Sequence, residues 1–161
     1  FVATWAGEDD SLPCLILNSH YDVVPVIAES WTVPAFAGLR KDGRIYGRGT
    51  QDMKCVCIQY IEAVRQLKKN GFSPRRSMHL TFVPDEEIGG VEGMCILLQS
   101  EWYTNIKQGP GVALALDEGL ASEDDDYSVF YGERLPWWVR VLYGVAFLGF
   151  IAAITIFGLL L

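Results

Sequence analysis

The chain has 161 residues, which is enough for one domain with a sizeable hydrophobic core. Its 20 acidic residues exceed its 13 basic residues and give a formal net charge of -7. Because nucleic acids bind to basic surfaces, this balance argues against a nucleic-acid partner.

The first part of the sequence predicts two strands. Residues 1–6 favour one strand, and the apolar run 15–18 favours a buried one. His20 and Asp22 would lie just past that run, at the strand end where ligands bind in open α/β sheets. The pair suits a metal-binding imidazole and the carboxylate that orients it. Taken alone, however, it is more often a His that closes a strand beside a turn Asp.

The next segments predict a loop, a turn and a long helix. Residues 23–39 are rich in Pro, Trp and Phe, which indicates an ordered loop over the site. The turn signal Lys-Asp-Gly-Arg at 41–44 precedes a strand that begins at Ile45. A helix is expected from about residue 53 to 69, with an apolar stripe along one face. Asp52 would then lie near the helix N-terminus, as an N-cap or as a metal ligand.

The second half alternates strands and helices. We expect a strand over 78–83, a helix over 91–107 and a short strand over 112–116. Residues 127–131 and 137–141 resemble final strands, and the acidic run 123–126 resembles a solvated loop. This order predicts an α/β fold, a three-layer sandwich with a mostly parallel sheet and an added apolar helix at the C-terminus.

The four cysteines form no C-x-x-C pair and lie in apolar surroundings. We therefore expect reduced core thiols of an intracellular domain rather than a disulfide framework. Cys55 and Cys57 could hold a metal, but the predicted helix explains their spacing better.

Acidic or His residues stand where each of four segments leaves the predicted sheet. They are His20 and Asp22, Asp52, Glu86 and Glu87, and Asp117 and Glu118. Neighbouring carboxylates repel and raise one another's pKa, so such a group is hard to explain without a cation. These side chains suit zinc, or two zinc ions bridged by a carboxylate, with a spare glutamate as general base.

Five motifs carry a resemblance to a known family: NSHYDVVPV, GRGTQDMK, VPDEEIGG, LDEG and ERLPWWVRV. Over residues 2–141 they resemble the di-zinc amidohydrolases, which include the aminoacylases, carboxypeptidase G2 and the succinyl-diaminopimelate desuccinylase. The second and third motifs are most similar to the aminoacylases. The resemblance implies that residues 1–141 are a partial zinc amidohydrolase catalytic domain.

The resemblance also implies the role of each site residue. Asp22 would orient the zinc-binding His, Glu86 would be the general base, and Asp117 is a weaker candidate beside Glu118. The zinc ligands would be His20 and Glu118 on the first ion, Glu87 on the second, and Asp52 bridging both. The implied reaction is cytoplasmic hydrolysis of an N-acyl-L-amino acid to a carboxylate and a free L-amino acid. A dipeptidase or carboxypeptidase of the same family is the alternative.

Members of this family continue past the WWVRV strand into a lid and dimerisation domain. That domain and the return to the catalytic domain supply a transition-state His, the second zinc's His and the homodimer contacts, which we expect to be absent here. His79, the only other His, is interpreted as a strand residue. Because losing one transition-state donor costs on the order of 100–1000-fold, we expect weak or no turnover.

Residues 142–161 carry no charge and match the roughly 20 residues that cross a bilayer. They would be a membrane anchor with Arg134 and Arg140 on its cytoplasmic flank, an aberrant terminus of an unstable product, or a helix covering exposed core. A non-catalytic, membrane-attached or partner-binding remnant is therefore the rival to an enzyme.

Overall fold

The computed structural model describes residues 1–119. Its main sheet has four strands in the order β1-β5-β2-β6. β2 pairs in parallel with β5 and β6, whereas β1 is antiparallel to β5. The sheet is therefore mixed and mostly parallel, as predicted. Its strands are β1 (Val2–Trp5), β2 (Cys14–His20), β5 (Met78–Val83) and β6 (Val112–Leu116).

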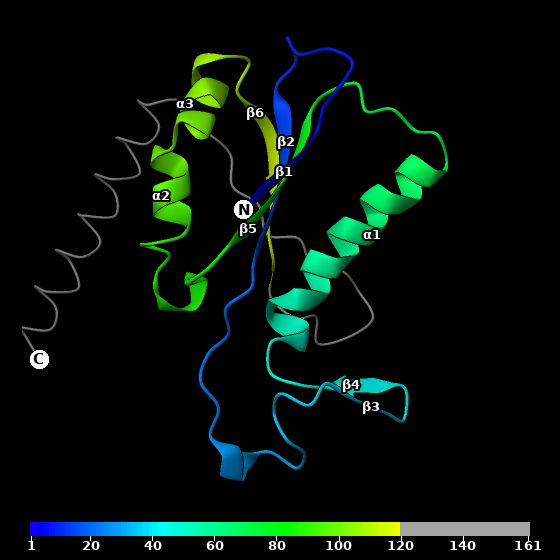
Figure 1. The fold of residues 1–161 in the computed structure, drawn as a ribbon, viewed down its shortest axis with the longest axis vertical. Helices are drawn as coiled ribbons and strands as arrows, with labels where there is room; N and C mark the ends of the chain where they lie inside the picture. The colour runs from blue at the N-terminus through cyan, green and yellow to red at the C-terminus, as the bar shows by residue number, and fades with distance from the viewer. Residues whose placement is uncertain (120–161) are drawn as a thin grey trace, which may run out of the picture. The chain divides into compact units, whose positions relative to one another are not determined.

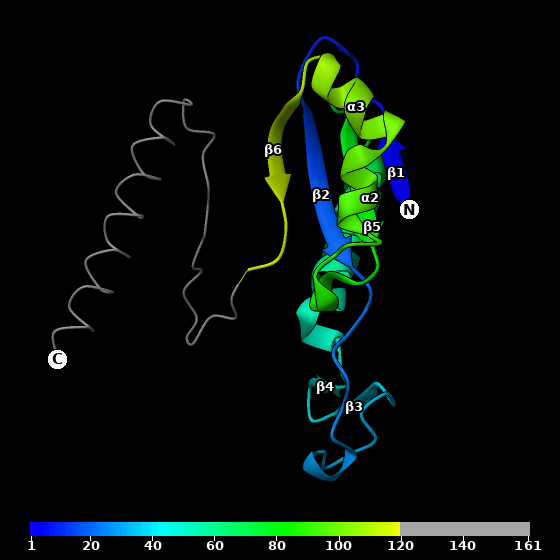
Figure 2. The ribbon, with the colours of Figure 1, turned by 90° about the vertical axis from the view of Figure 1, so that its left-hand side faces the viewer.

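Helices cover both faces of the sheet. α1 (Cys55–Lys69) lies on one side, and α2 (Met94–Gln99) and α3 (Glu101–Gln108) lie on the other (Figure 1). Figure 2 shows the four strands side by side, with α2 and α3 in front of them. The described residues thus form the predicted three layers of an α/β fold.

The core lies along the two central strands. β2 has a strand on each edge and helices over both faces, so most of its residues are buried. Cys14 and Leu17 supply apolar core contacts near its start. Its other end is polar but equally buried, with Ser19 and His20 each 1% exposed. Because buried polar groups need hydrogen-bond partners, Ser19 and His20 must be paired with polar groups of neighbouring segments.

A two-stranded hairpin, β3 (Leu39–Lys41) and β4 (Arg44–Tyr46), follows the loop at residues 23–38. Asp42 and Gly43 form its turn with φ of 51° and 72°. Positive φ at both positions is the hallmark of the two-residue turns favoured by Asp-Gly. The turn signal and the strand at Ile45 are therefore confirmed. The loop itself contains only one short 3-10 turn, Ala28–Ser30.

The predicted helix over 53–69 is largely confirmed, but α1 begins at Cys55. An irregular turn, Thr50–Lys54, precedes it, and the backbone at Asp52 and Met53 is not helical. Asp52 therefore does not cap α1 with its side chain. The turn needs Gly49, because φ there is 78° and a Cβ would lie 2.3 Å from Val23 Cγ1. This turn, rather than a regular helix end, positions Asp52.

The single helix predicted over 91–107 is wrong. Ser100 leaves the helical conformation, with φ of -67° and ψ of 157°, and separates α2 from α3. Its Oγ accepts a hydrogen bond from Tyr103 N and donates one to Leu97 O. Apolar periodicity runs through both helices, so the pattern gave no sign that a serine would end one and cap the next.

The cysteine prediction holds only in part. The four cysteines all lie in the described residues and are free thiols. Cys14 is buried in the core, but Cys95 is exposed, so it is not a core thiol. Cys55 and Cys57 lie in the first turn of α1, as the helical pattern indicated.

Several expectations fall outside residues 1–119: the strands at 127–131 and 137–141, the acidic loop at 123–126, and the apolar segment 142–161. Among the helices within residues 1–119, none has the length and apolar character to span a bilayer. The boundary between a domain at 1–141 and a separate segment after it also stays a prediction.

Candidate metal centre

His20 is the last residue of β2, not a residue just beyond it as expected from the sequence. The pairing of β2 with β6 ends at Leu17 and Leu116, so the sheet supplies no partner for the His20 N–H. Met53 Sδ accepts that N–H at 3.1 Å, and Met53 is itself fully buried. The turn that carries Asp52 is thus anchored directly on the strand that carries His20.

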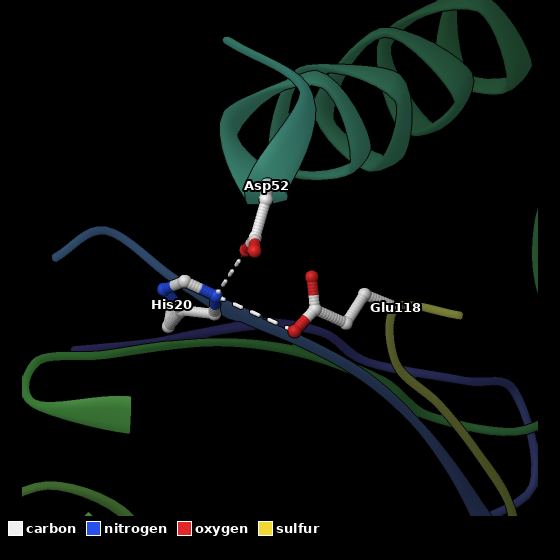
Figure 3. A group of neighbouring side chains, drawn as sticks. All are labelled: His20, Asp52 and Glu118. Atoms are coloured by element: carbon white, nitrogen blue, oxygen red, sulfur yellow. Dashed lines mark hydrogen bonds and ion pairs between the residues drawn. The ribbon is translucent and has the colours of Figure 1, made fainter. Parts of the chain in front are cut away.

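Three carboxylates from separate segments surround His20 Nε2. Asp52 Oδ1 lies at 3.1 Å, Glu118 Oε1 at 3.5 Å and Glu86 Oε2 at 3.7 Å. Figure 3 shows Asp52 reaching the imidazole from the turn before α1, and Glu118 reaching it from the segment after β6. Glu86 comes from the turn after β5. Three different segments of the chain, each following a strand, therefore place a carboxylate next to the same nitrogen of His20.

Asp22 holds the opposite side of the imidazole ring. His20 Nδ1 lies 3.2 Å from the carbonyl oxygen of Asp22 and 3.2 Å from its carboxylate Oδ1, with hydrogen-bond geometry met at the carbonyl. The other carboxylate oxygen, Oδ2, accepts the N–H of Glu87 at 3.1 Å. An acceptor that holds Nδ1, so that Nε2 faces the other carboxylates, is the arrangement expected of a carboxylate that orients a metal-binding His.

The two consecutive glutamates contact different groups. Asp85, with φ of 60°, starts a 3-10 turn that contains both of them. Glu86 points to His20, whereas a Glu87 carboxylate oxygen accepts the N–H of Val24 at 3.3 Å. Glu87 is therefore not brought into the group around His20 in the described residues.

Asp117 and Glu118, left as alternatives by the sequence, also separate. Glu118 faces His20, but the carboxylate of Asp117 accepts hydrogen bonds from Asn18 Nδ2 and from Glu118 N. Sequence reasoning missed two supporting residues: Asn18, which donates to Asp117, and Met53, which accepts the N–H of His20. A polar Asn inside an otherwise apolar strand was the available signal for the first, and nothing marked the second.

The pKa values show how strongly these charges interact. Burial and the neighbouring Asp52 carboxylate raise the pKa of Glu118 to about 7. Burial lowers the pKa of His20, but Glu118, Glu86 and Asp22 together outweigh it and raise that pKa above its ordinary value. Burial also opposes ionisation of Asp22, yet the N–H groups of Glu87 and Glu86 hold its pKa below normal. A negative cluster of this kind favours a bound cation.

The geometry of the group fits a divalent metal. His20, Asp52 and Glu118 each offer one ligand atom, and these atoms all lie within 4.8 Å of one another. Tetrahedral zinc, with bonds of about 2.0–2.1 Å, separates its ligand atoms by about 3.4 Å. The His20 distances to Asp52 and Glu118 bracket this value. The imidazole is 1% exposed while Asp52 is 51% exposed, so the centre has a buried base and an open side.

His79 lies in β5 and is separate from the metal group. Its Nδ1 is 2.9 Å from Thr4 Oγ1, and its ring packs edge-on against Trp102. It is a strand residue, as the sequence suggested.

Comparison with known proteins gives consistent matches. The family model described as "Peptidase family M20/M25/M40" matches residues 16–129. Aminoacylase-1 of Sus scrofa is 52% identical over 141 residues, which cover 87% of this chain and 34% of that protein. Aminoacylase-1 of Dictyostelium discoideum is 48% identical over 137 residues, covering 84% and 33%. This chain therefore spans about a third of the length of these relatives.

A solved structure shares the fold. The crystal structure of human carnosine dipeptidase 1 superimposes with a TM-score of 0.60 at 23% sequence identity. The match covers 72% of this chain and 24% of that one.

Proposed function

This chain belongs to peptidase family M20/M25/M40, and from that premise we propose that it carries the zinc-binding part of an N-acyl-L-amino-acid hydrolase. The proposal rests on one observation: His20, Asp52 and Glu118 each place a possible ligand atom within 4.8 Å of the others. The names of the relatives at about 50% identity support the substrate class, an acylated amino acid that is cleaved to a carboxylate and a free L-amino acid.

In this proposal His20 and Glu118 would hold a first zinc ion and Glu87 a second, and Asp52 would contribute its carboxylate to both. Bound zinc supplies Lewis-acid polarisation of the scissile carbonyl and lowers the pKa of the attacking water. Asp22 holds His20 Nδ1, which keeps Nε2 directed to the metal position.

Glu86 is the proposed general base. Its Oε2 lies 3.7 Å from His20 Nε2, so it borders the metal group without belonging to the set of three ligand atoms. Its side chain is half exposed, which leaves it free to take a proton from water and to deliver it to the leaving amine. Glu86→Gln should therefore lower any turnover by about 100-fold or more while leaving zinc content unchanged.

The second zinc is the weaker part of the proposed site. Among the described residues, the Glu87 carboxylate accepts the N–H of Val24 rather than facing the His20 group. We therefore propose that the 161-residue chain binds the first ion firmly and the second poorly, and that its turnover is on the order of 100–1000-fold below that of full-length aminoacylase-1 relatives.

The test uses the full 161-residue chain and its His20→Ala variant. After dialysis against zinc buffer, the wild type should retain at least one zinc that the variant does not, measured by elemental analysis. Hydrolysis of N-acetylmethionine should be far slower than that by the Sus scrofa aminoacylase-1 assayed in parallel. Equal zinc content in the two proteins would refute the metal site, and an equal hydrolysis rate would refute the impairment.

The same assays separate the alternatives. Faster cleavage of an unblocked dipeptide than of N-acetylmethionine would favour a dipeptidase. Two zinc ions per chain would favour a working centre, whereas none, together with no hydrolysis, would favour a non-catalytic remnant.

A further inference from the structure

A hydrogen-bond network that is buried at Thr81 and Asn18 crosses the sheet next to the metal group and ends at the exposed Asp117. Thr81 Oγ1, on β5, donates to Asn18 Oδ1, on β2, at 2.6 Å. Asn18 Nδ2 then donates to Asp117 Oδ2, just past β6, at 2.8 Å. Thr81 is 1% exposed and Asn18 is 6% exposed, so water cannot easily replace either partner. The amide of Asn18 is therefore fixed with its oxygen toward β5 and its nitrogen toward Asp117.

Asp117 in turn holds the backbone of its neighbour, Glu118. Its Oδ1 accepts the backbone N–H of Glu118 at 2.9 Å, while its Oδ2 is held by Asn18. Both oxygens of its carboxylate are thus engaged. The next carboxylate along the chain, that of Glu118, is the one that reaches His20 Nε2.

Helix α1 is tied to the same point. Tyr60, on α1, donates its hydroxyl to the backbone carbonyl of Asp117 at 3.2 Å. Burial and the nearby Asp117 charge raise the pKa of Tyr60, so it remains a donor at neutral pH. Because α1 directly follows the turn that carries Asp52, this bond joins the segment of one carboxylate to the segment of another.

We propose that Asn18 is a positioning residue for the metal group: its amide holds Asp117 in place and thereby presents Glu118, not Asp117, to the metal. The inference rests on the proposed zinc site and adds the residue that selects between two adjacent carboxylates. Asn is suited to this role because it accepts from Thr81 on one side and donates to a carboxylate on the other.

The first variant is Asn18→Asp, which keeps the size of the side chain. It replaces the donor that faces Asp117 with a second carboxylate oxygen, so the two side chains repel. Loss of a partner that orients a ligand typically lowers metal affinity 10–100-fold. We expect that loss in the zinc dissociation constant of the full chain, measured by competition with a chromophoric chelator, and a change in the visible spectrum of the Co²⁺-loaded protein.

The rescue is the double variant Asn18→Asp with Asp117→Asn, which exchanges donor and acceptor. Asp at position 18 still accepts from Thr81, and Asn at position 117 donates to it while still accepting from Glu118 N. Every hydrogen bond of the network is restored at unchanged net charge. Zinc affinity and the Co²⁺ spectrum should return to within a few-fold of the wild type.

The matched control is Thr4→Val, which removes a side-chain contact of the same sheet, that with His79, but leaves the network intact. It should lower thermal stability without changing zinc affinity. If Asn18→Asp does not fold, Tyr60→Phe tests the same network from the side of α1, and a smaller loss of affinity is expected. Unchanged zinc affinity in the folded variants, with His20→Ala abolishing binding, would overturn the positioning role alone. No zinc binding by the wild type would overturn the proposed function instead.

Discussion

At the scale of single residues, His20 is the centre of the candidate site because it is the one member that the sheet buries completely. Its two nitrogens have distinct surroundings, with Asp22 on Nδ1 and three further carboxylates around Nε2. Removing one of these carboxylates changes both the protonation of the buried His20 and the set of groups that it contacts. Substitutions here are therefore informative only when metal binding is measured beside stability.

Zinc should stabilise the protein through this group. Zinc present at 100 times its dissociation constant should add about 2.7 kcal/mol to the free energy of unfolding. We expect Glu118→Gln to lose most of this gain, since Glu118 faces His20, and Glu87→Gln to keep most of it, since Glu87 contacts Val24. Thermal unfolding with and without zinc measures both. Equal losses in the two variants would contradict the assignment of Glu118 to the first ion.

His79 should give the stability a pH dependence that is independent of zinc. Burial lowers its pKa from 6.5, so below pH 6.5 the unfolded chain binds the proton first and the folded state loses stability. Stability is complete above pH 6.5 and falls as the pH drops toward the lower pKa of the folded state, by at most about 1.4 kcal/mol per pH unit. Urea unfolding at pH 7.5 and 5.5 should show a larger drop for the wild type than for His79→Asn. An equal drop would contradict the buried neutral imidazole.

At the scale of elements, the connections at the carboxyl ends of β2, β5 and β6 supply the site, and each is irregular. Asp52 lies in a non-helical turn, Glu86 in a 3-10 turn, and Glu118 in a segment without regular secondary structure beyond β6. The parallel strands bring the connections to one edge of the sheet, and the irregular turns aim the side chains inward.

The break between α2 and α3 gives a second element-scale prediction. Ser100 caps α3 by accepting the N–H of Tyr103, so Ser100→Ala should lower the free energy of unfolding by about 1 kcal/mol. Ser100→Asp supplies another cap acceptor and should restore most of the loss. Urea denaturation of the three proteins provides the comparison, and an alanine variant as stable as the wild type would show that the cap contributes nothing.

At the scale of the whole molecule, the uncharged segment 142–161 lies outside the described residues. One of the three interpretations of residues 142–161, which carry no charge, is that they associate with membranes. A central Ile154→Arg substitution costs about 2.5–3.5 kcal/mol on an insertion scale and should reduce flotation of the full chain with lipid vesicles. The exposed Ile27→Arg, in the loop after β2, is the control and should leave flotation unchanged. No flotation of the wild type would refute the membrane interpretation.

Local patterns were sufficient for much of the described fold. The strands at 78–83 and 112–116, the helix that ends at Lys69 and the Asp-Gly turn each depend on residues within a few positions of one another. Apolar runs, periodicity and turn residues therefore predicted them. The alternation of strands and helices was also enough to indicate three layers.

By itself, the sequence determined the fold class, the polar ends of the strands and the motifs that mark the family. Only the tertiary structure decided which carboxylates meet His20, that Glu87 and Asp117 contact other groups, and that Met53 and Asn18 support the centre. The reason is physical: these choices depend on contacts between residues 32 to 99 positions apart. Such contacts exist only after the strands have paired, and no local pattern encodes the direction in which a side chain then points.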